Sequence, residues 1–152
     1  MNFTEFKTEF LLRAKSADAC SDEYKRAYKS ESFSELLKVI TDNFSYCCKN
    51  KIIDADLLNS IPTDDLKAAD IHVNTSASSG WIYAYDSATV MASGSATVRA
   101  YGSATVEASG SAYINSFNSR DHKISGNAIL RYFCENRVVL AQGIKSFNQS
   151  KS

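Results

Sequence analysis

The chain has 152 residues, 17 Lys and Arg balance 17 Asp and Glu, and 44% of the residues are apolar. This composition favours a folded chain of one domain or two small ones over a disordered chain. Zero net charge disfavours direct, sequence-specific binding to nucleic acid. No apolar stretch approaches the roughly 20 residues of a membrane span, and the start lacks the apolar block of a secretory signal. We therefore expect a cytoplasmic protein without membrane contact.

The cysteines and histidines show no metal-ligand spacing. None of the four cysteines belongs to a C-x-x-C pair, and the two histidines lie far apart in the sequence. Free thiols are the usual state of cysteine in the cytosol. We predict no disulfide, no zinc site and no other cofactor, with reduced thiols at Cys20, Cys47, Cys48 and Cys134.

The first third of the chain has the apolar spacing of α-helices. A helical stripe begins at Phe3 behind Asn2, and a stronger stripe runs from Phe33 to Cys48 behind the capping box of Ser32 and Glu35. A weak helix is expected after Ser21, and a short one from Asp54 to Leu58, ahead of Pro62. Residues 1–65 are therefore predicted to form an α-helical subdomain.

From Ala77 onward the sequence repeats every eight residues, as in SGSATVRA (93–100) followed by YGSATVEA (101–108). The fourth, sixth and eighth positions of a block are apolar, and Ser, Thr or a variable residue lies between them. Alternation with a period of two is typical of a strand with one buried face. Glycine, Asp or Asn at the second position supplies the turn between strands. Each block is therefore predicted to be one strand and one turn.

The first position of the blocks shows that the structural unit is sixteen residues. It alternates between Tyr or Phe and Ser, with aromatic residues at Tyr85, Tyr101, Phe117 and Phe133. The period predicts a parallel two-faced β-solenoid of 16-residue coils over 66–145, four coils spanning 77–140, and a disordered tail at 146–152. The fold class is α+β. An antiparallel meander explains the period of eight but not that of sixteen.

The solenoid pattern also predicts which residues are neighbours. Equivalent positions of successive coils lie one above another in a stacked repeat. We expect Ile82, Val98, Ile114 and Leu130 to stack in one sheet and to face Val90, Val106 and Val138 of the other. The aromatic residues at the first position should form a column along one corner. One block departs from the pattern, because His122 occupies a position held elsewhere by Ile, Val or Leu, and we predict a loop that bulges outward there.

No pattern in the chain indicates catalysis. Neither a G-x-S-x-G elbow nor a phosphate-binding glycine loop occurs, and a thin solenoid filled with Ala and Val leaves no substrate cavity. We predict that the protein is not an enzyme. Trp, Tyr and Arg, which commonly anchor protein interfaces, lie at outward positions of one sheet. The candidate interaction residues are Trp81, Tyr83, Arg99, Tyr113 and Arg131, together with Arg120, His122 and Lys123 of the predicted loop.

The repeated blocks, closed by GNAILRY (126–132), resemble octapeptide-repeat proteins of bacteria and their phages. The likeness extends to Ala19-Cys20 and to the stretch FSYCCKN (44–50). It implies an origin in a phage or mobile element and, by analogy, an inhibitor that docks on a host defence complex, such as a CRISPR effector. The expected partner is a protein, including one within a nucleoprotein defence complex. The alternative is a structural solenoid that self-assembles into multimers or filaments, whereas the inhibitor is expected to be a monomer or homodimer.

Overall fold

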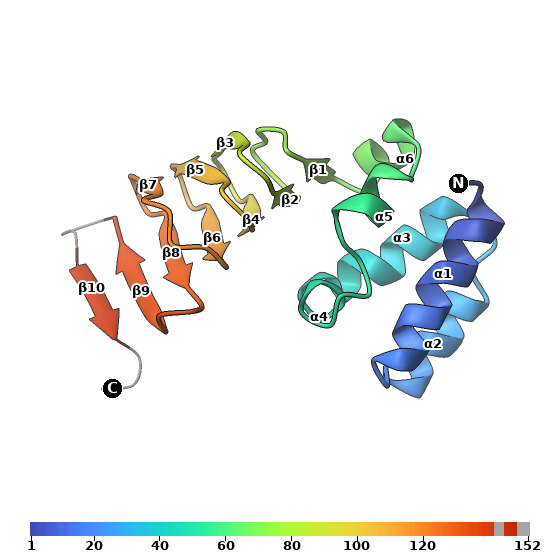
Figure 1. The fold of residues 1–152 in the computed structure, drawn as a ribbon. Helices are drawn as coiled ribbons and strands as arrows, with labels where there is room; N and C mark the ends of the chain where they lie inside the picture. The colour runs from blue at the N-terminus through green and yellow to red at the C-terminus, as the bar shows by residue number, and fades with distance from the viewer. Residues whose placement is uncertain (142–144, 149–152) are drawn as a thin grey trace. The chain divides into compact units, whose positions relative to one another are not determined.

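The computed structural model describes residues 1–141 and the backbone of residues 145–148. The chain divides into two compact units, a helical one over Met1–Ala69 and a β-unit that begins at Asp70 (Figure 1). The boundary falls four residues after the end of the predicted helical subdomain at residue 65. Each unit has buried apolar residues of its own.

The helical unit holds six helices whose starts are capped largely as the sequence indicates. The Asn2 side chain accepts a hydrogen bond from the amide of Glu5 at 2.8 Å, and Asp54 accepts from the amide of Leu57 at 2.9 Å. Phe6, Leu36 and Leu58 are fully buried within this unit. The helices are α1 (Phe3–Ser16), α2 (Ser21–Tyr28), α3 (Phe33–Asp42), α4 (Phe44–Lys49), α5 (Ala55–Asn59) and α6 (Thr63–Ala68).

Two features of this unit differ from the sequence-based expectation. The single helix predicted from Phe33 to Cys48 is broken into α3 and α4 at Asn43, whose side-chain amide donates to the carbonyl oxygen of Val39 at 2.9 Å. Asparagine interrupts helices in this way because its side chain competes with backbone amides for carbonyl oxygens. Helix α6 was not predicted. Pro62 ends the preceding segment, but it also immediately precedes α6. Proline is tolerated at the start of a helix because the backbone N–H that it lacks has no partner within the helix there.

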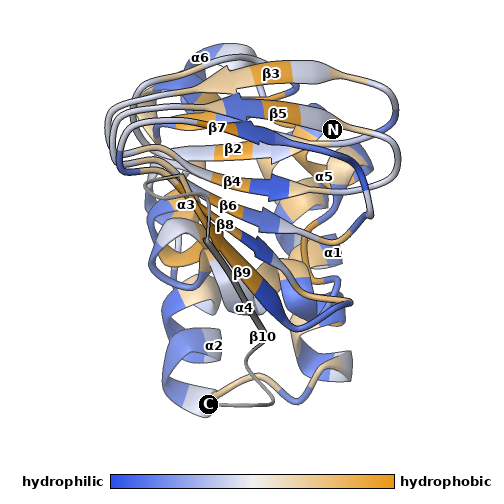
Figure 2. Ribbon diagram, turned by 90° about the vertical axis from the view of Figure 1, so that its left-hand side faces the viewer, coloured by the Kyte–Doolittle hydropathy of each residue, from blue (hydrophilic) through white to orange (hydrophobic). Residues whose placement is uncertain are grey.

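The β-unit is a parallel two-sheet solenoid with sixteen residues per coil, which confirms the predicted fold class. The register pairs Ile82 with Val98, Val98 with Ile114, and Ile114 with Leu130, so equivalent side chains lie one above another. The larger sheet has the order β1-β2-β4-β6-β8-β9-β10 and the smaller one β3-β5-β7 (Figures 1 and 2). The strands are β1 (Ile71–Val73), β2 (Trp81–Ala84), β3 (Thr89–Ala92), β4 (Thr97–Ala100), β5 (Thr105–Ala108), β6 (Tyr113–Ser116), β7 (Lys123–Ile124), β8 (Ile129–Tyr132), β9 (Arg137–Leu140) and β10 (Lys145–Asn148).

The core of the solenoid is narrow and consists of aliphatic side chains from both sheets. Ile82, Val98 and Ile114 of the larger sheet and Val90 and Val106 of the smaller one are fully buried. Alanines at the flanking inward positions are buried as well, which lets the two sheets approach closely. The period-two pattern of the sequence therefore predicted the inward face correctly.

The C-terminal end of the solenoid departs from the predicted fourth coil. Strand β9 turns back antiparallel to β8 in the larger sheet, so Val138 pairs with Arg131 instead of joining the sheet of Val90 and Val106. A tight turn explains the reversal, because the amide of Asn136 donates to the carbonyl of Phe133 at 3.2 Å and Asn136 has a φ of +48°. Strand β10 then pairs with β9 as far as Asn148. The disordered tail predicted from residue 146 is therefore wrong for residues 146–148, and residues 149–152 lie outside the described residues.

Candidate functional site

His122 lies inside the solenoid, and the outward bulge predicted for this segment is wrong. Strand β7 keeps the register of the smaller sheet through the pair of Glu107 and Lys123, and the imidazole, 8% exposed, occupies the inward position beneath Val106. The backbone amide of Val106 donates to Nδ1 at 3.0 Å. Nε2 lies 2.9 Å from Ser116 Oγ and 3.0 Å from Asn118 Oδ1. These partners remove the penalty of a buried unpaired imidazole, on which the predicted bulge was based.

The hydrogen bonds of His122 determine its tautomer. The amide of Val106 can only donate, so Nδ1 accepts and the proton of the neutral ring resides on Nε2. A second proton on Nδ1 would break the bond to Val106 and place a charge in the core. Burial accordingly lowers the pKa of His122 below its ordinary value of 6.5, with a smaller opposing effect from the charge of Asp121.

We predict that acid destabilises the solenoid through His122. Between pH 6.5 and the lower pKa of the folded state, the unfolded chain binds a proton at His122 that the folded chain does not. The contribution of neutral His122 to stability is therefore complete above pH 6.5 and declines as the pH falls through the folded pKa. The measurement is urea unfolding at pH 7.5 and pH 5, with His122→Gln as the comparison. The loss of stability between the two pH values should be smaller in the variant, and equal losses would contradict the prediction.

The outer side of the larger sheet carries a continuous stack of aromatic rings. Tyr83 stacks on Tyr101 with ring centroids 4.9 Å apart, Tyr101 on Phe117 at 4.9 Å, and Phe117 on Phe133 at 4.6 Å. The predicted column is confirmed for Tyr101, Phe117 and Phe133. At its first coil, however, the ring that stacks on Tyr101 is that of Tyr83, and Tyr85, the predicted first member, contacts the ring of Tyr83 at 6.2 Å. The near-parallel rings follow the spacing between coils, about 4.8 Å.

Two arginines in the same outward column as Tyr83 lie against the rings of Phe117 and Phe133. The guanidinium carbon of Arg99 lies 4.6 Å from the centroid of Phe117, and that of Arg131 lies 4.2 Å from the centroid of Phe133. The register separates the two arginines by Asn115, so they are two coils apart. We call Tyr83, Arg99, Tyr101, Phe117, Arg131 and Phe133 the arginine–aromatic face.

Arg99 is 3% exposed although it points away from the core. Its Nε donates to the hydroxyl oxygen of Tyr101 at 3.2 Å, and no ion pair or further hydrogen bond of Arg99 occurs within residues 1–141. The Nε of Arg131 is buried without a hydrogen-bond partner in the same part of the chain. Burial of a guanidinium without a counter-charge is unfavourable, even where aromatic rings compensate part of the loss.

The structure brings only some of the predicted interaction residues together. Trp81, Thr97 and Tyr113 form one half-buried column, as expected, and the column of Tyr83, Arg99 and Arg131 lies beside it. Arg120 and Lys123 are exposed but belong to the segment around β7, in the smaller sheet or next to it, whereas His122 is buried. Sequence reasoning missed Phe117 and Phe133 as site residues, although their spacing of sixteen already placed them in one column.

Comparison with family models, with curated proteins and with solved structures found no match. Among the described residues, no three His, Cys, Asp or Glu side chains come together as a metal site would require. No helix there combines the length and the apolar character needed to cross a membrane.

Proposed function

We propose that this protein is a non-enzymatic binding protein that docks its arginine–aromatic face on an acidic surface of a partner protein. The observation that carries the proposal is Arg99, which is 3% exposed and whose contacts among residues 1–141 are the ring of Phe117 and the hydroxyl of Tyr101. The Nη nitrogens of Arg99 are not among the fully enclosed unpaired atoms of the described residues, so a carboxylate from a partner can approach them and supply the missing counter-charge. Aromatic stacking holds the guanidinium in place in advance, which lowers the entropic cost of binding.

The spacing of the two arginines restricts the partner. They lie two coils apart, about 10 Å along the sheet, so the matching surface needs two acidic groups at a similar separation. Half-buried Trp81 and Tyr113 in the adjacent column add apolar contact area beside the charges. Arg, Trp and Tyr together are the residue types that dominate binding energy in protein interfaces.

The resemblance to octapeptide-repeat proteins of bacteria and phages suggests the biological setting. We propose that the partner belongs to a host defence complex, such as a CRISPR effector, and that the protein acts in the host cytoplasm as a stoichiometric inhibitor. The acidic surface would then be a protein surface of that complex rather than its nucleic acid.

The self-assembling alternative needs strands to pair between molecules, and the antiparallel β9 and β10 change the pairing pattern at one end. Light scattering at rising concentration separates the two, because a filament former grows in mass.

The decisive experiment compares three variants in capture from bacterial lysate. Arg99→Met keeps much of the side-chain volume and removes the charge, Arg99→Lys keeps the charge, and Lys123→Met removes an exposed charge outside the arginine–aromatic face. We expect at least tenfold weaker capture of the principal partner by Arg99→Met, partial recovery by Arg99→Lys, and wild-type capture by Lys123→Met. Equal capture by Arg99→Met and wild type would overturn the proposal.

Stability measurements on the same variants separate binding from folding. Replacement of a buried, uncompensated charge by an apolar side chain of similar size is often neutral or stabilising. The free Arg99→Met protein should therefore resist urea at least as well as the wild type while it loses its partner. Reduced stability together with lost capture would indicate a role of Arg99 in folding and would contradict the proposed role in docking.

A further inference from the structure

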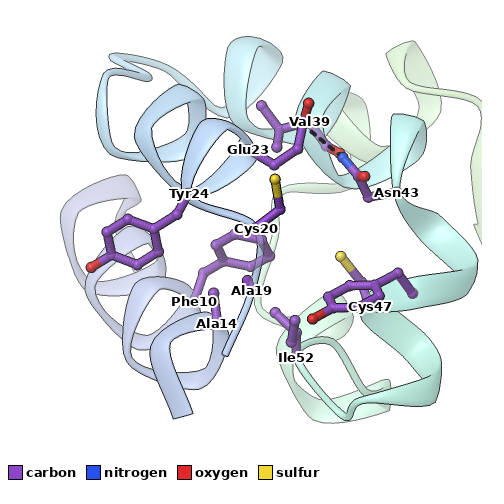
Figure 3. Close-up of a pocket in the computed structure, with 11 residues that line it drawn as sticks. Phe10, Ala14, Ala19, Cys20, Glu23, Tyr24, Val39, Asn43, Cys47 and Ile52 are labelled. Carbon is purple, nitrogen blue, oxygen red and sulfur yellow. Dashed lines mark hydrogen bonds between the residues drawn. The ribbon is translucent and has the colours of Figure 1, made fainter. Parts of the chain in front are cut away.

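The helical unit contains a pocket of about 170 Å³ that the docking proposal does not use (Figure 3). Helices α1, α2, α3 and α4 and the segment before α2 surround it. Its lining is mainly apolar: Phe10, Ala14, Val39 and Ile52 are buried side chains at its wall. An apolar cavity of about 150 Å³ stays dry and accepts a benzene-sized molecule, so this pocket has room for a single aromatic ring with a short substituent.

Glu23 is the one charged residue in the lining of the pocket. Its Oε2 accepts a hydrogen bond from Asn43 Nδ2 at 2.9 Å and contacts Arg26 at 3.3 Å. Its Oε1 has no hydrogen-bond partner in the described part of the chain. Arg26 also contacts Asp42, outside the pocket, at 2.8 Å, so this cation is divided between two carboxylates and neutralises Glu23 only in part. The polar end of the pocket therefore favours a cation.

The thiol of Cys47 beside Glu23 adds no competing charge. Burial, with smaller contributions from the charges of Cys48 and Glu23, raises the pKa of Cys47 to about 12, so its thiol stays neutral at physiological pH. Cys20 is exposed and also lines the pocket. Tyr24 and Tyr46 contribute aromatic rings to the wall, and such rings attract an ammonium group as well as an apolar ring.

From these contacts we infer that the pocket binds a small aromatic amine, with its ring among Phe10, Val39 and Ile52 and its ammonium group at Glu23. On the scale of a benzene ring in about 150 Å³, the cavity limits the ligand to about seven or eight heavy atoms. Arylalkylamines of the size of benzylamine fit this description. The inference is independent of the docking proposal, because the residues that carry it belong to the helical unit.

The first test compares three probes of nearly equal size and different charge. Benzylamine, benzyl alcohol and benzoate are titrated into the full-length protein at pH 7.5, and the shift in melting temperature and the heat of binding are measured. We expect benzylamine to bind about tenfold more tightly than benzyl alcohol, because its ammonium group gains a charge-assisted contact with Glu23. Benzoate should bind most weakly. Equal affinity for all three probes, or no binding of benzylamine at millimolar concentration, would overturn the inference.

The cysteines provide a positional readout within the same sample. Cys20 lines the pocket and Cys134 is exposed in the β-unit. Bound benzylamine should slow the alkylation of Cys20 by iodoacetamide severalfold and leave the rate at Cys134 unchanged, as followed by mass spectrometry of peptides. Equal slowing at both cysteines would indicate an effect on the reagent and not on the pocket.

Two variants complete the test. Glu23→Gln should abolish the preference for benzylamine over benzyl alcohol, while the neutral probe still binds. Glu23 also contacts Asn43 and Arg26, so its replacement could disturb the fold. The second variant therefore leaves Glu23 and these contacts unchanged. Ala14→Leu adds three carbons to the wall, so it should abolish binding of both probes and raise the melting temperature of the free protein. Undiminished binding by Ala14→Leu would exclude this pocket as the site.

Discussion

Replacing Ile114 by alanine should lower the free energy of unfolding of the β-unit by about 2–5 kcal/mol. Ile114 is fully buried in β6, and the register places it between Val98 and Leu130. Its removal opens a void in the middle of the coil stack, and hydrogen bonds to the coils on both sides limit the collapse of the backbone into that void. The narrow core has no second layer of side chains that could fill the space.

Trp81 provides a specific measurement of this effect. It is the single tryptophan of the chain and lies in β2, so its fluorescence during urea unfolding follows the β-unit, whereas circular dichroism at 222 nm follows mainly the helices. Thr105→Ala, at an outward position of β5, is the control and should cost about 1 kcal/mol or less. If Ile114→Ala costs no more than the control, the packing of the core is not what holds the coils together.

The second large effect is expected at a turn, where Gly94→Ala should destabilise the β-unit by about 2–4 kcal/mol. Gly94 has a φ of +54°, a left-handed conformation that is unfavourable for alanine. A Cβ atom at this position would also overlap the carbonyl oxygen of Ser78 in the coil below. That oxygen accepts the amide hydrogen of Ser95 at 3.0 Å, so relief of the overlap disturbs the contact between coils.

Gly102 offers a matched control for the two components of this cost. Its φ of +58° is nearly the same, but its nearest contact for a Cβ atom is the backbone nitrogen of Asp86 at 3.2 Å. Gly102→Ala should therefore show mainly the conformational cost of about 1–2 kcal/mol. Gly102→Asn should cost less, because asparagine tolerates positive φ and Asp86 already adopts a φ of +54° one coil earlier. Equal losses for Gly94→Ala and Gly102→Ala would show that the overlap with Ser78 is unimportant.

The repeat predicted much of the fold because strand period and coil length both leave a direct trace in the sequence. The stack of Ile82, Val98, Ile114 and Leu130 follows from those two periods alone. The hairpin at β9 could not be read in the same way. Residues 133–140 still match the inward pattern of a block. Whether they form a fourth parallel coil or a hairpin depends on a four-residue turn, and hydrophobic spacing does not specify the conformation of that turn at Asn136.

The candidate site was less predictable than the fold. Alternation identified Arg99 as outward but did not show that it is buried, because the ring of Phe117 that lies against it comes from the next coil. The error at His122 has a related origin, since the sequence does not show that the amide of Val106 and the side chains of Ser116 and Asn118 surround the imidazole. The pocket in the helical unit depends on the break at Asn43, which the apolar stripe of that helix conceals.

The identical register of successive coils has a consequence for how such a chain can evolve. Strands β2, β4, β6 and β8 pair residue for residue at intervals of sixteen, so each coil offers the same backbone edge to the next. In-frame duplication or deletion of one coil would leave every inward position inward and every turn glycine at a turn. The molecule could thus lengthen or shorten in rungs of about 4.8 Å and so adjust the distance between the two arginines to a partner that changes.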